Sequence, residues 1–271
     1  MAIRTVLLHA STDSGFNDRL SFAVAFARQF GASVTAIYTL YPTGVPRVGR
    51  ALSIYVNELV REAKEKEAPL KAQFDEALKA ASVSGAWETI EGDVASALRD
   101  AVTFADVTVV SETRYGTVDD ELAATLPEHL ALASNGPVIV VPTGKPVPAR
   151  IGRIVVAWKP SREAGHAVRF ALPVLAGADA VEVLTIAEGS EKAAASGARL
   201  TAYLASHGVN ATHKHLSEVN AAAAIVAEVD AFGANLLVLG AYSRSRLAEL
   251  VLGGVTASLL DNPPVPLLIA H

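Results

Sequence analysis

Short apolar runs alternate along the chain with longer segments in which apolar residues recur at helical spacing. The run TVLLH (5–9) precedes DRLSFAVAFARQF, whose apolar residues share one helical face: Leu20, Ala23, Val24 and Ala27. Gly31 follows where a helix is expected to end. The pattern predicts a buried strand followed by an amphipathic helix.

The second half of the chain repeats this order. The run IVVAW (154–158) precedes Ser161, which is placed to cap a helix with the apolar stripe Ala164, Val168, Ala171, Leu172 and Leu175. Three further strand-like runs also have counterparts: 34–40 with 181–187, 105–111 with 234–240, and 137–141 with 266–270. In the later pairs Ser111 matches Gly240 and Pro137 matches Pro266, so one constant offset indicates a duplication.

The first half carries an additional stretch at about 48–82, which predicts one long charged helix, or two if Pro69 breaks it. The segment PTGKPVPAR (142–150) is typical of a linker. We therefore predict an α/β protein of two tandem Rossmann-like domains, residues 1–145 and 150–271. Each is expected to hold a five-stranded parallel sheet flanked by helices, with ligands at the carboxyl ends of the strands.

Composition narrows the class of function. A net charge of −5 over 271 residues argues against nucleic acid and anionic membranes as partners. The absence of cysteine excludes disulfides and thiolate chemistry, and no apolar stretch is long enough for a signal peptide or a membrane helix. We expect a cytoplasmic protein with no membrane partner.

The strand at 234–240 runs into the segment with the clearest chemical pattern. Gly240, Ser243 and Gly253 are separated by two and then nine residues, and Gly254 follows. Glycines between a strand and a helix let the backbone approach a phosphate group, to which Ser243, Arg244 and Ser245 could add donors. The alternative is a tight helix entry beside an ordinary polar surface loop.

This terminal segment, GAYSRSRLAELVLGGVTASLLDNPPVPLLIAH, resembles that of universal stress proteins, whose ATP-binding members carry Gly-x2-Gly-x9-Gly-(Ser/Thr). Ser243 replaces the second glycine of that motif, and Gly254 stands where the family has Ser or Thr. The resemblance extends to AWKPSREAGHAVRFALPVL and covers nearly the whole chain. It implies a nucleotide such as ATP as the ligand, with Mg²⁺ present only together with the nucleotide.

The same resemblance assigns three further site residues and shows a departure from the family. Lys159 stands where the family has a carboxylate that contacts adenine, and Ile186 corresponds to an adenine-contacting position after the second strand. Trp158 could stack on a purine or fill the purine's place. In the first half the motif is lost, because Ser111, Arg114 and Ala124 replace its glycines. The acid is lost at Ser11 unless Asp13 takes its place.

These observations predict a universal stress protein that senses stress by binding a nucleotide in its C-terminal domain. The alternatives are an interaction scaffold that binds no nucleotide and, third, a weak ATPase. No P-loop, dinucleotide fingerprint or nucleophile elbow occurs, so we expect a non-enzyme. The resemblance also implies an internal pseudo-dimer joined through the two final strands, with a homodimer as an open alternative. His213 and His215 favour a polar pair at a sheet edge over a metal site.

Overall fold

The computed structural model describes residues 2–41, 50–112, 126–133, 136–187, 191–217, 220–241 and 254–271. The chain forms two compact units. The N-terminal unit comprises Ile3–Gly136 and Thr143–Ala149, and the C-terminal unit is built mainly from Pro137–Pro142 and Arg150–His271. The strand at 138–141 belongs to the C-terminal compact unit, although it lies within the predicted N-terminal domain. Domain limits at 1–145 and 150–271 therefore stay a prediction.

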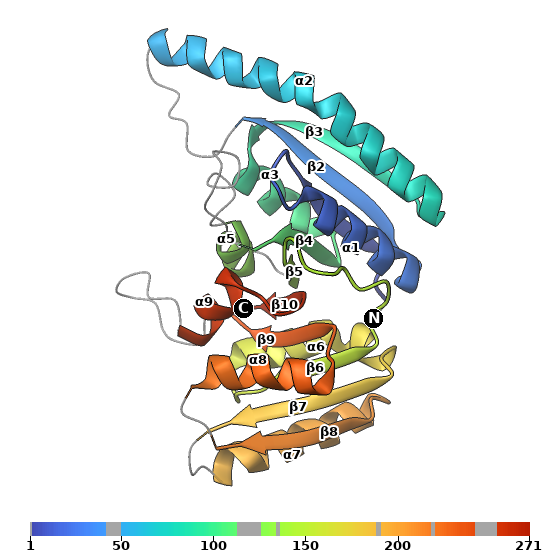
Figure 1. The fold of residues 1–271 in the computed structure, drawn as a ribbon, viewed down its shortest axis with the longest axis vertical. Helices are drawn as coiled ribbons and strands as arrows, with labels where there is room; N and C mark the ends of the chain where they lie inside the picture. Colours follow the sequence, from blue (N-terminus) through green and yellow to red (C-terminus); the bar gives the residue numbers. More distant parts are fainter. Residues whose placement is uncertain are drawn as a thin grey trace. The chain divides into compact units, whose positions relative to one another are not determined.

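The N-terminal unit is built around four parallel strands in the order β3-β2-β1-β4 (Figure 1). The strands are β1 (Thr5–Ala10), β2 (Ser33–Tyr41), β3 (Gly85–Asp93) and β4 (Val107–Ser111). The helices are α1 (Phe16–Phe30), α2 (Arg50–Ala81), α3 (Val94–Ala101) and α5 (Leu126–Ala133), with a 3₁₀ turn, η1, at Val102–Phe104. β1 and β4 are buried almost throughout, as their aliphatic runs predict.

Helix α1 shows how closely the sequence pattern fixes an element of this unit. Its buried face contains the predicted stripe, and Gly31 ends the helix with φ 64°, a left-handed conformation that glycine adopts without strain. Arg19 is the exception on that face, because it is a fully buried charge. Burial of an arginine requires partners, and these are described with the site.

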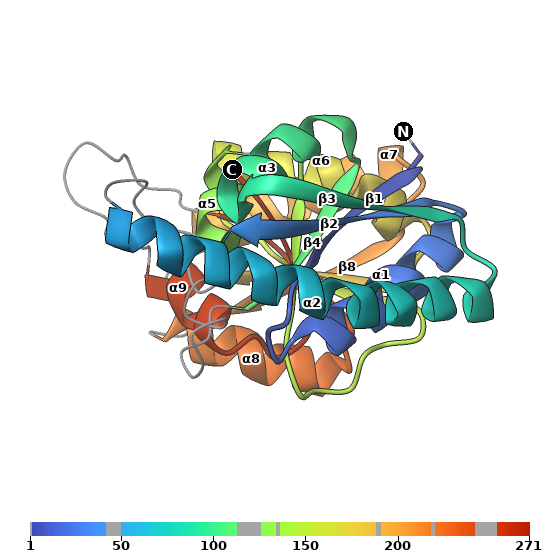
Figure 2. The same ribbon diagram turned by 90° about the horizontal axis from the view of Figure 1, so that it is seen from above.

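Helix α2 is one continuous helix that contains Pro69. Figure 2 shows it running along β2, and the Tyr38 hydroxyl of β2 donates a 2.8 Å hydrogen bond to the Ala63 carbonyl. Phe74 and Leu78 are buried from the second half of the helix. Of the two predicted alternatives, one helix or two, the structure therefore has one.

The C-terminal unit has the strand order β5-β10-β9-β6-β7-β8. All neighbours are parallel except β5 and β10, which are antiparallel. The strands are β5 (Val138–Val141), β6 (Arg153–Ala157), β7 (Ala180–Ile186), β8 (Ala211–Leu216), β9 (Leu236–Gly240) and β10 (Leu267–Ala270). The helices are α6 (Arg162–Ala176), α7 (Glu191–Ser206), α8 (Ala221–Phe232) and α9 (Gly254–Asp261). The last strands of the two sequence repeats thus pair with each other, as predicted.

Helices cover both faces of the C-terminal sheet (Figure 1). Consecutive residues of a strand point to opposite faces. On β8, the His213 ring lies against Gly197 of α7, whereas the Lys214 side chain reaches Glu228 of α8. The predicted class, an α/β fold with a mostly parallel sheet flanked by helices, is confirmed.

The two units repeat one strand register. Val6 of β1 lies opposite Val107 of β4, and Ile154 of β6 lies opposite Leu236 of β9. Taken with the offset of 129 that the sequence gives for the fourth strands, these registers place corresponding first-strand residues 148 positions apart. Together the two offsets identify corresponding residues in the two units.

Candidate functional site

In the C-terminal unit three predicted site residues meet at one edge of the sheet. β6 lies between β9 and β7, and Ala157 at its end is opposite Leu239 on one side and Leu184 on the other. Parallel strands end at the same edge, so Trp158, Gly240 and Ile186 lie together there. β6 and β9 are also where the chain reverses its direction across the sheet, which is where doubly wound folds bind ligands.

Gly240 has a packing role at this edge. A Cβ on Gly240 would lie 2.7 Å from the Glu163 carbonyl carbon and 2.8 Å from the Ala164 Cα, and closer still to the Ala164 nitrogen. All three are backbone atoms of the first turn of α6, so they cannot move aside as a side chain could. Glycine at this position therefore lets the start of α6 approach the end of β9.

Trp158 and Lys159 follow β6 at the same edge. The Trp158 backbone N–H donates to the Leu184 carbonyl at 2.8 Å, which holds the residue beside β7. Its indole Nε1 is buried without a hydrogen-bond partner among the described residues, although the side chain is partly exposed. Lys159 is exposed and forms no ion pair within the described part of the chain.

The start of α6 adds polar groups that the sequence pattern only partly predicted. Ser161 caps the helix by accepting from the Ala164 N–H at 3.2 Å, as predicted. His271 Nδ1 lies 3.1 Å from the Ala241 carbonyl and therefore carries a proton, which leaves Nε2 to accept from Arg162 at 3.5 Å. His166 Nδ1 likewise donates to the His271 carbonyl at 3.0 Å. Sequence reasoning missed these contacts of His271, because they join residues 30 to 109 positions apart.

Of the remaining predicted residues, the structure describes only Gly254. Gly254 is the first residue of α9, where it is exposed and a Cβ would meet no described atom within 4 Å. Four predicted residues lie outside the described residues: Ser243, Arg244, Ser245 and Gly253. Only Gly240, Trp158, Lys159 and Ile186 are therefore placed at one edge.

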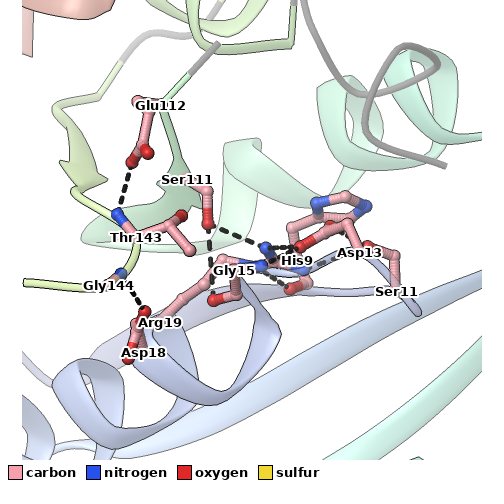
Figure 3. A network of polar contacts seen from close by, with 10 residues as sticks. All are labelled: His9, Ser11, Asp13, Gly15, Asp18, Arg19, Ser111, Glu112, Thr143 and Gly144. Atoms are coloured by element: carbon pink, nitrogen blue, oxygen red, sulfur yellow. Dashed lines mark hydrogen bonds and ion pairs between the residues drawn. The ribbon is translucent and has the colours of Figure 1, made fainter. Parts of the chain in front are cut away.

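The corresponding edge of the N-terminal unit is occupied by the side chain of Arg19 (Figure 3). Its Nη1 contacts Asp13 Oδ1 at 2.5 Å and Ser111 Oγ at 2.8 Å. Its Nε donates to the His9 carbonyl at 2.8 Å, and its Nη2 donates to Ser11 Oγ at 3.0 Å. The guanidinium thus fills the point between the ends of β1 and β4.

The electrostatics of this network are those of a closed ion pair. Burial would raise the pKa of Asp13, but the charge and hydrogen bond of Arg19 outweigh it and hold that pKa well below its usual range. Burial, together with the nearby positive charge of Arg19, lowers the pKa of His9 to about 3. Asp13 is therefore ionised and His9 neutral at physiological pH. Of the two alternatives for the first-strand acid, Asp13 is the one that enters this edge.

The strand offsets show what the C-terminal unit has in place of these residues. Ala167 corresponds to Arg19, Lys159 to Ser11 and Ser161 to Asp13. Ala167 is buried, and its methyl group cannot reach the strand ends as a guanidinium does. Among the described residues of the C-terminal edge, no buried cation takes the place of Arg19.

The contact between the first helix and the fourth strand contains a glycine in both units, but on different elements. In the N-terminal unit the glycine is Gly15, whose added Cβ would meet the Ser111 side chain, with Ser111 Cβ at 3.0 Å. In the C-terminal unit the corresponding residues are Glu163 and Gly240. Each unit therefore keeps one glycine where the first helix approaches the fourth strand.

His213 and His215 form a polar pair on β8. His213 Nε2 lies 3.0 Å, and His215 Nδ1 2.9 Å, from the buried hydroxyl of Thr185 on β7. Within the described ranges, no group of three or more His, Asp or Glu side chains is arranged to hold a metal ion. None of the helices described there has the length and apolar character needed to cross a membrane.

Comparison with known proteins adds to this geometry. Residues 150–271 match the model of the universal stress protein family. A universal stress protein from Archaeoglobus fulgidus DSM 4304 superposes with a TM-score of 0.77 at 15% identity, covering 98% of this chain and 96% of that one. A protein of unknown function from Pseudomonas aeruginosa PAO1 superposes with a TM-score of 0.57 at 15% identity, covering 99% of this chain and 92% of that one. No curated protein matches the sequence significantly.

The fold and the repeated register define a tandem α/β protein with two doubly wound units. More particularly, residues 150–271 match the universal stress protein family model, and the whole chain shares its fold with a universal stress protein of known structure.

Proposed function

We propose that this protein is a stress-associated sensor that binds a nucleotide in its C-terminal unit, at the carboxyl ends of β9, β6 and β7. ATP or a related nucleotide is the proposed ligand, and Mg²⁺ accompanies the nucleotide rather than binding to the free protein. Binding favours one arrangement of the chain over another and does not require hydrolysis.

The proposal rests on the difference between Arg19 of α1 and the corresponding Ala167 of α6. Arg19 fills the edge of the N-terminal unit, whereas Ala167 leaves the corresponding C-terminal position without a buried cation. The exposed side chain of Lys159 adds positive charge beside the start of α6, where Arg162 is paired with Glu163 at 3.6 Å. A helix start with nearby cations favours phosphate, so this edge suits the phosphate groups of a nucleotide.

A second function, an interaction scaffold without a nucleotide, is favoured by Trp158 and Lys159. Lys159 stands where the resembled family has a carboxylate for adenine, and Trp158 lies beside Gly240, where its ring can occupy a purine's place. A weak ATPase is the third candidate.

Native mass spectrometry of the purified protein, with and without added ATP and Mg²⁺, tests the proposal. We expect a mass increase of one nucleotide, and a bare chain under all loading conditions would support the scaffold instead. Lys159→Glu should weaken binding by placing a negative charge beside the phosphate groups. Arg199→Glu, at an exposed position of α7, is the matched control and should bind as the unaltered protein does.

A second variant transfers the N-terminal arrangement to the C-terminal edge. In Ala167→Arg/Ser161→Asp the new guanidinium brings its own carboxylate, so the buried charge is paired. We expect this variant to fold and to lose nucleotide binding. Unchanged binding by the folded variant would place the nucleotide elsewhere.

A further inference from the structure

Four separate segments of the N-terminal unit converge where β1 and β4 end (Figure 3). They are the turn after β1, the first turn of α1, the end of β4, and the segment Thr143–Gly144 that follows β5. The residues after β4, 113–125, lie outside the described part of the chain. The contacts that join the four segments are given residue by residue below.

Arg19 forms the inner layer of this convergence. It is fully buried, and its four acceptors come from three segments: His9 from β1, Ser11 and Asp13 from the turn, and Ser111 from β4. Asp13 also accepts from the Gly15 N–H at 2.8 Å and from the Ser11 hydroxyl. The guanidinium and Asp13 therefore tie the start of α1 to the end of β4.

Thr143 and Gly144 form the outer layer. The Thr143 N–H donates to Glu112 Oε2 at 2.7 Å, and the Gly144 N–H donates to Asp18 Oδ2 at 2.7 Å. Gly144 has φ 71°, a left-handed conformation that favours glycine. Both acceptors are carboxylates, and hydrogen bonds to charged groups are stronger than those between neutral groups.

The two layers are anchored on adjacent residues. Glu112, which holds Thr143, directly follows Ser111, which accepts from Arg19. Asp18, which holds Gly144, directly precedes Arg19. A Cβ on Gly15 would lie 2.7 Å from Thr143 Oγ1 and also meet Ser111, so the three segments pack at one point.

We propose that Thr143–Gly144 is a strap that covers the buried Arg19 network: Arg19 joins the ends of β1 and β4 inside, and Asp18 and Glu112 hold the strap outside. The two layers open together, because they are anchored on adjacent residues at the start of α1 and the end of β4. Closure of the Arg19 network and anchorage of the segment that leads into the C-terminal unit are then one equilibrium. An ordinary turn would instead open without affecting Arg19.

Coupling between two sites is reciprocal, which makes the proposal testable from both sides. In Asp18→Ala/Glu112→Ala the strap loses both acceptors. Amide exchange measured by NMR should rise about tenfold or more at Thr143 and Gly144. The decisive signal is the Nε–H of Arg19, which should also exchange faster although none of its own partners has been removed. Asn17→Ala, an exposed change beside Asp18, is the control and should leave both signals unchanged.

The reverse test removes the inner layer. Arg19→Met/Asp13→Asn deletes both charges and leaves no buried ion unpaired. Amides of Thr143 and Gly144 should exchange faster, while amides of β2 keep their protection. Arg28→Met, on the exposed side of α1, is the matched control.

An unchanged Arg19 Nε–H in the strap variant overturns the proposal, as does unchanged exchange at Thr143 and Gly144 in a folded inner-layer variant. If the inner-layer variant does not fold, the strap variant decides alone.

Discussion

Arg19 is the residue that most distinguishes the two units. The hydrophobic pattern of α1 identified the buried stripe around Leu20 and Ala23, but it could not identify a buried arginine beside that stripe. The partners that make its burial favourable include Ser111, which lies 92 positions away in the sequence. Contacts of that separation leave no periodic signal, so Asp13 could be named only as an alternative and Arg19 not at all.

Removing Arg19 alone should destabilise the protein strongly. Arg19→Met leaves the buried carboxylate of Asp13 without its partner, and breaking a buried pair in this way costs about 3–5 kcal/mol of unfolding free energy. Urea denaturation measures the change. Arg19→Met/Asp13→Asn should recover part of the loss, and Arg28→Met should lie within about 0.5 kcal/mol of the unaltered protein. A loss no larger in Arg19→Met than in Arg28→Met would show that the pair contributes little.

His9 should make stability depend on pH. Its folded-state pKa of about 3 lies below the unfolded value of about 6.5, so the unfolded chain binds a proton that the folded chain does not. The free energy of unfolding should therefore fall as the pH falls from about 6.5 towards 4.5, by up to about 1.4 kcal/mol per pH unit from this residue. Asp13 adds little to this dependence, because its ordinary pKa of 3.8 already lies below that range and its folded pKa is lower still.

His9→Gln should flatten this dependence, whatever its effect on stability at pH 7. Urea denaturation at several pH values gives the slope for both proteins. Equal slopes would mean that His9 does not titrate on unfolding.

At the scale of the elements, the alternation of strands and helices was predictable, and the reason for a single glycine was not. Each predicted strand run overlaps a strand of the structure, because buried parallel strands produce short aliphatic runs that helices interrupt. Gly240 was assigned to a phosphate loop by its spacing from Ser243 and Gly253. The structure gives it a packing reason as well, and motif spacing cannot separate these two roles.

Gly240→Ala should destabilise the contact between α6 and β9. The added Cβ meets backbone atoms of Glu163 and Ala164, and overpacking of this kind costs about 1–3 kcal/mol. Gly254→Ala is the comparison, since a Cβ there meets no described atom and alanine in a helix stabilises by about 0.4–1 kcal/mol. Differential scanning calorimetry should give opposite shifts in Tm. A neutral Gly240→Ala would mean that α6 can move away from β9.

At the scale of the whole molecule, the sequence identified the duplication but not the difference in charge between the two edges. The constant offset of the later strands was readable from Ser111 and Gly240, and the strand registers extend it to the first strands. The correspondence of Arg19 with Ala167 follows from the first-strand register. The glycines that end α1 and α6, Gly31 and Gly177, are closer in sequence than that register predicts, so they would pair Arg19 with a different residue.

A nucleotide should therefore protect one unit only. At about 100 times its dissociation constant, ATP should stabilise the folded state by roughly 2.7 kcal/mol. Hydrogen exchange with mass spectrometry should show slower exchange at the ends of β6 and β9, and no change at the ends of β1 and β4. Protection at both edges would contradict a site confined to the C-terminal unit.

The different positions of Gly15 and Gly240 restrict the exchange of strands between the two units. Replacing β9 by β4 would bring a serine against Glu163, with no glycine on either side of that contact. Replacing β4 by β9 would instead place a glycine against Gly15 and leave the contact loose. Each unit has its glycine on the opposite side of this contact, so exchanging either strand calls for a second change in the helix that it meets.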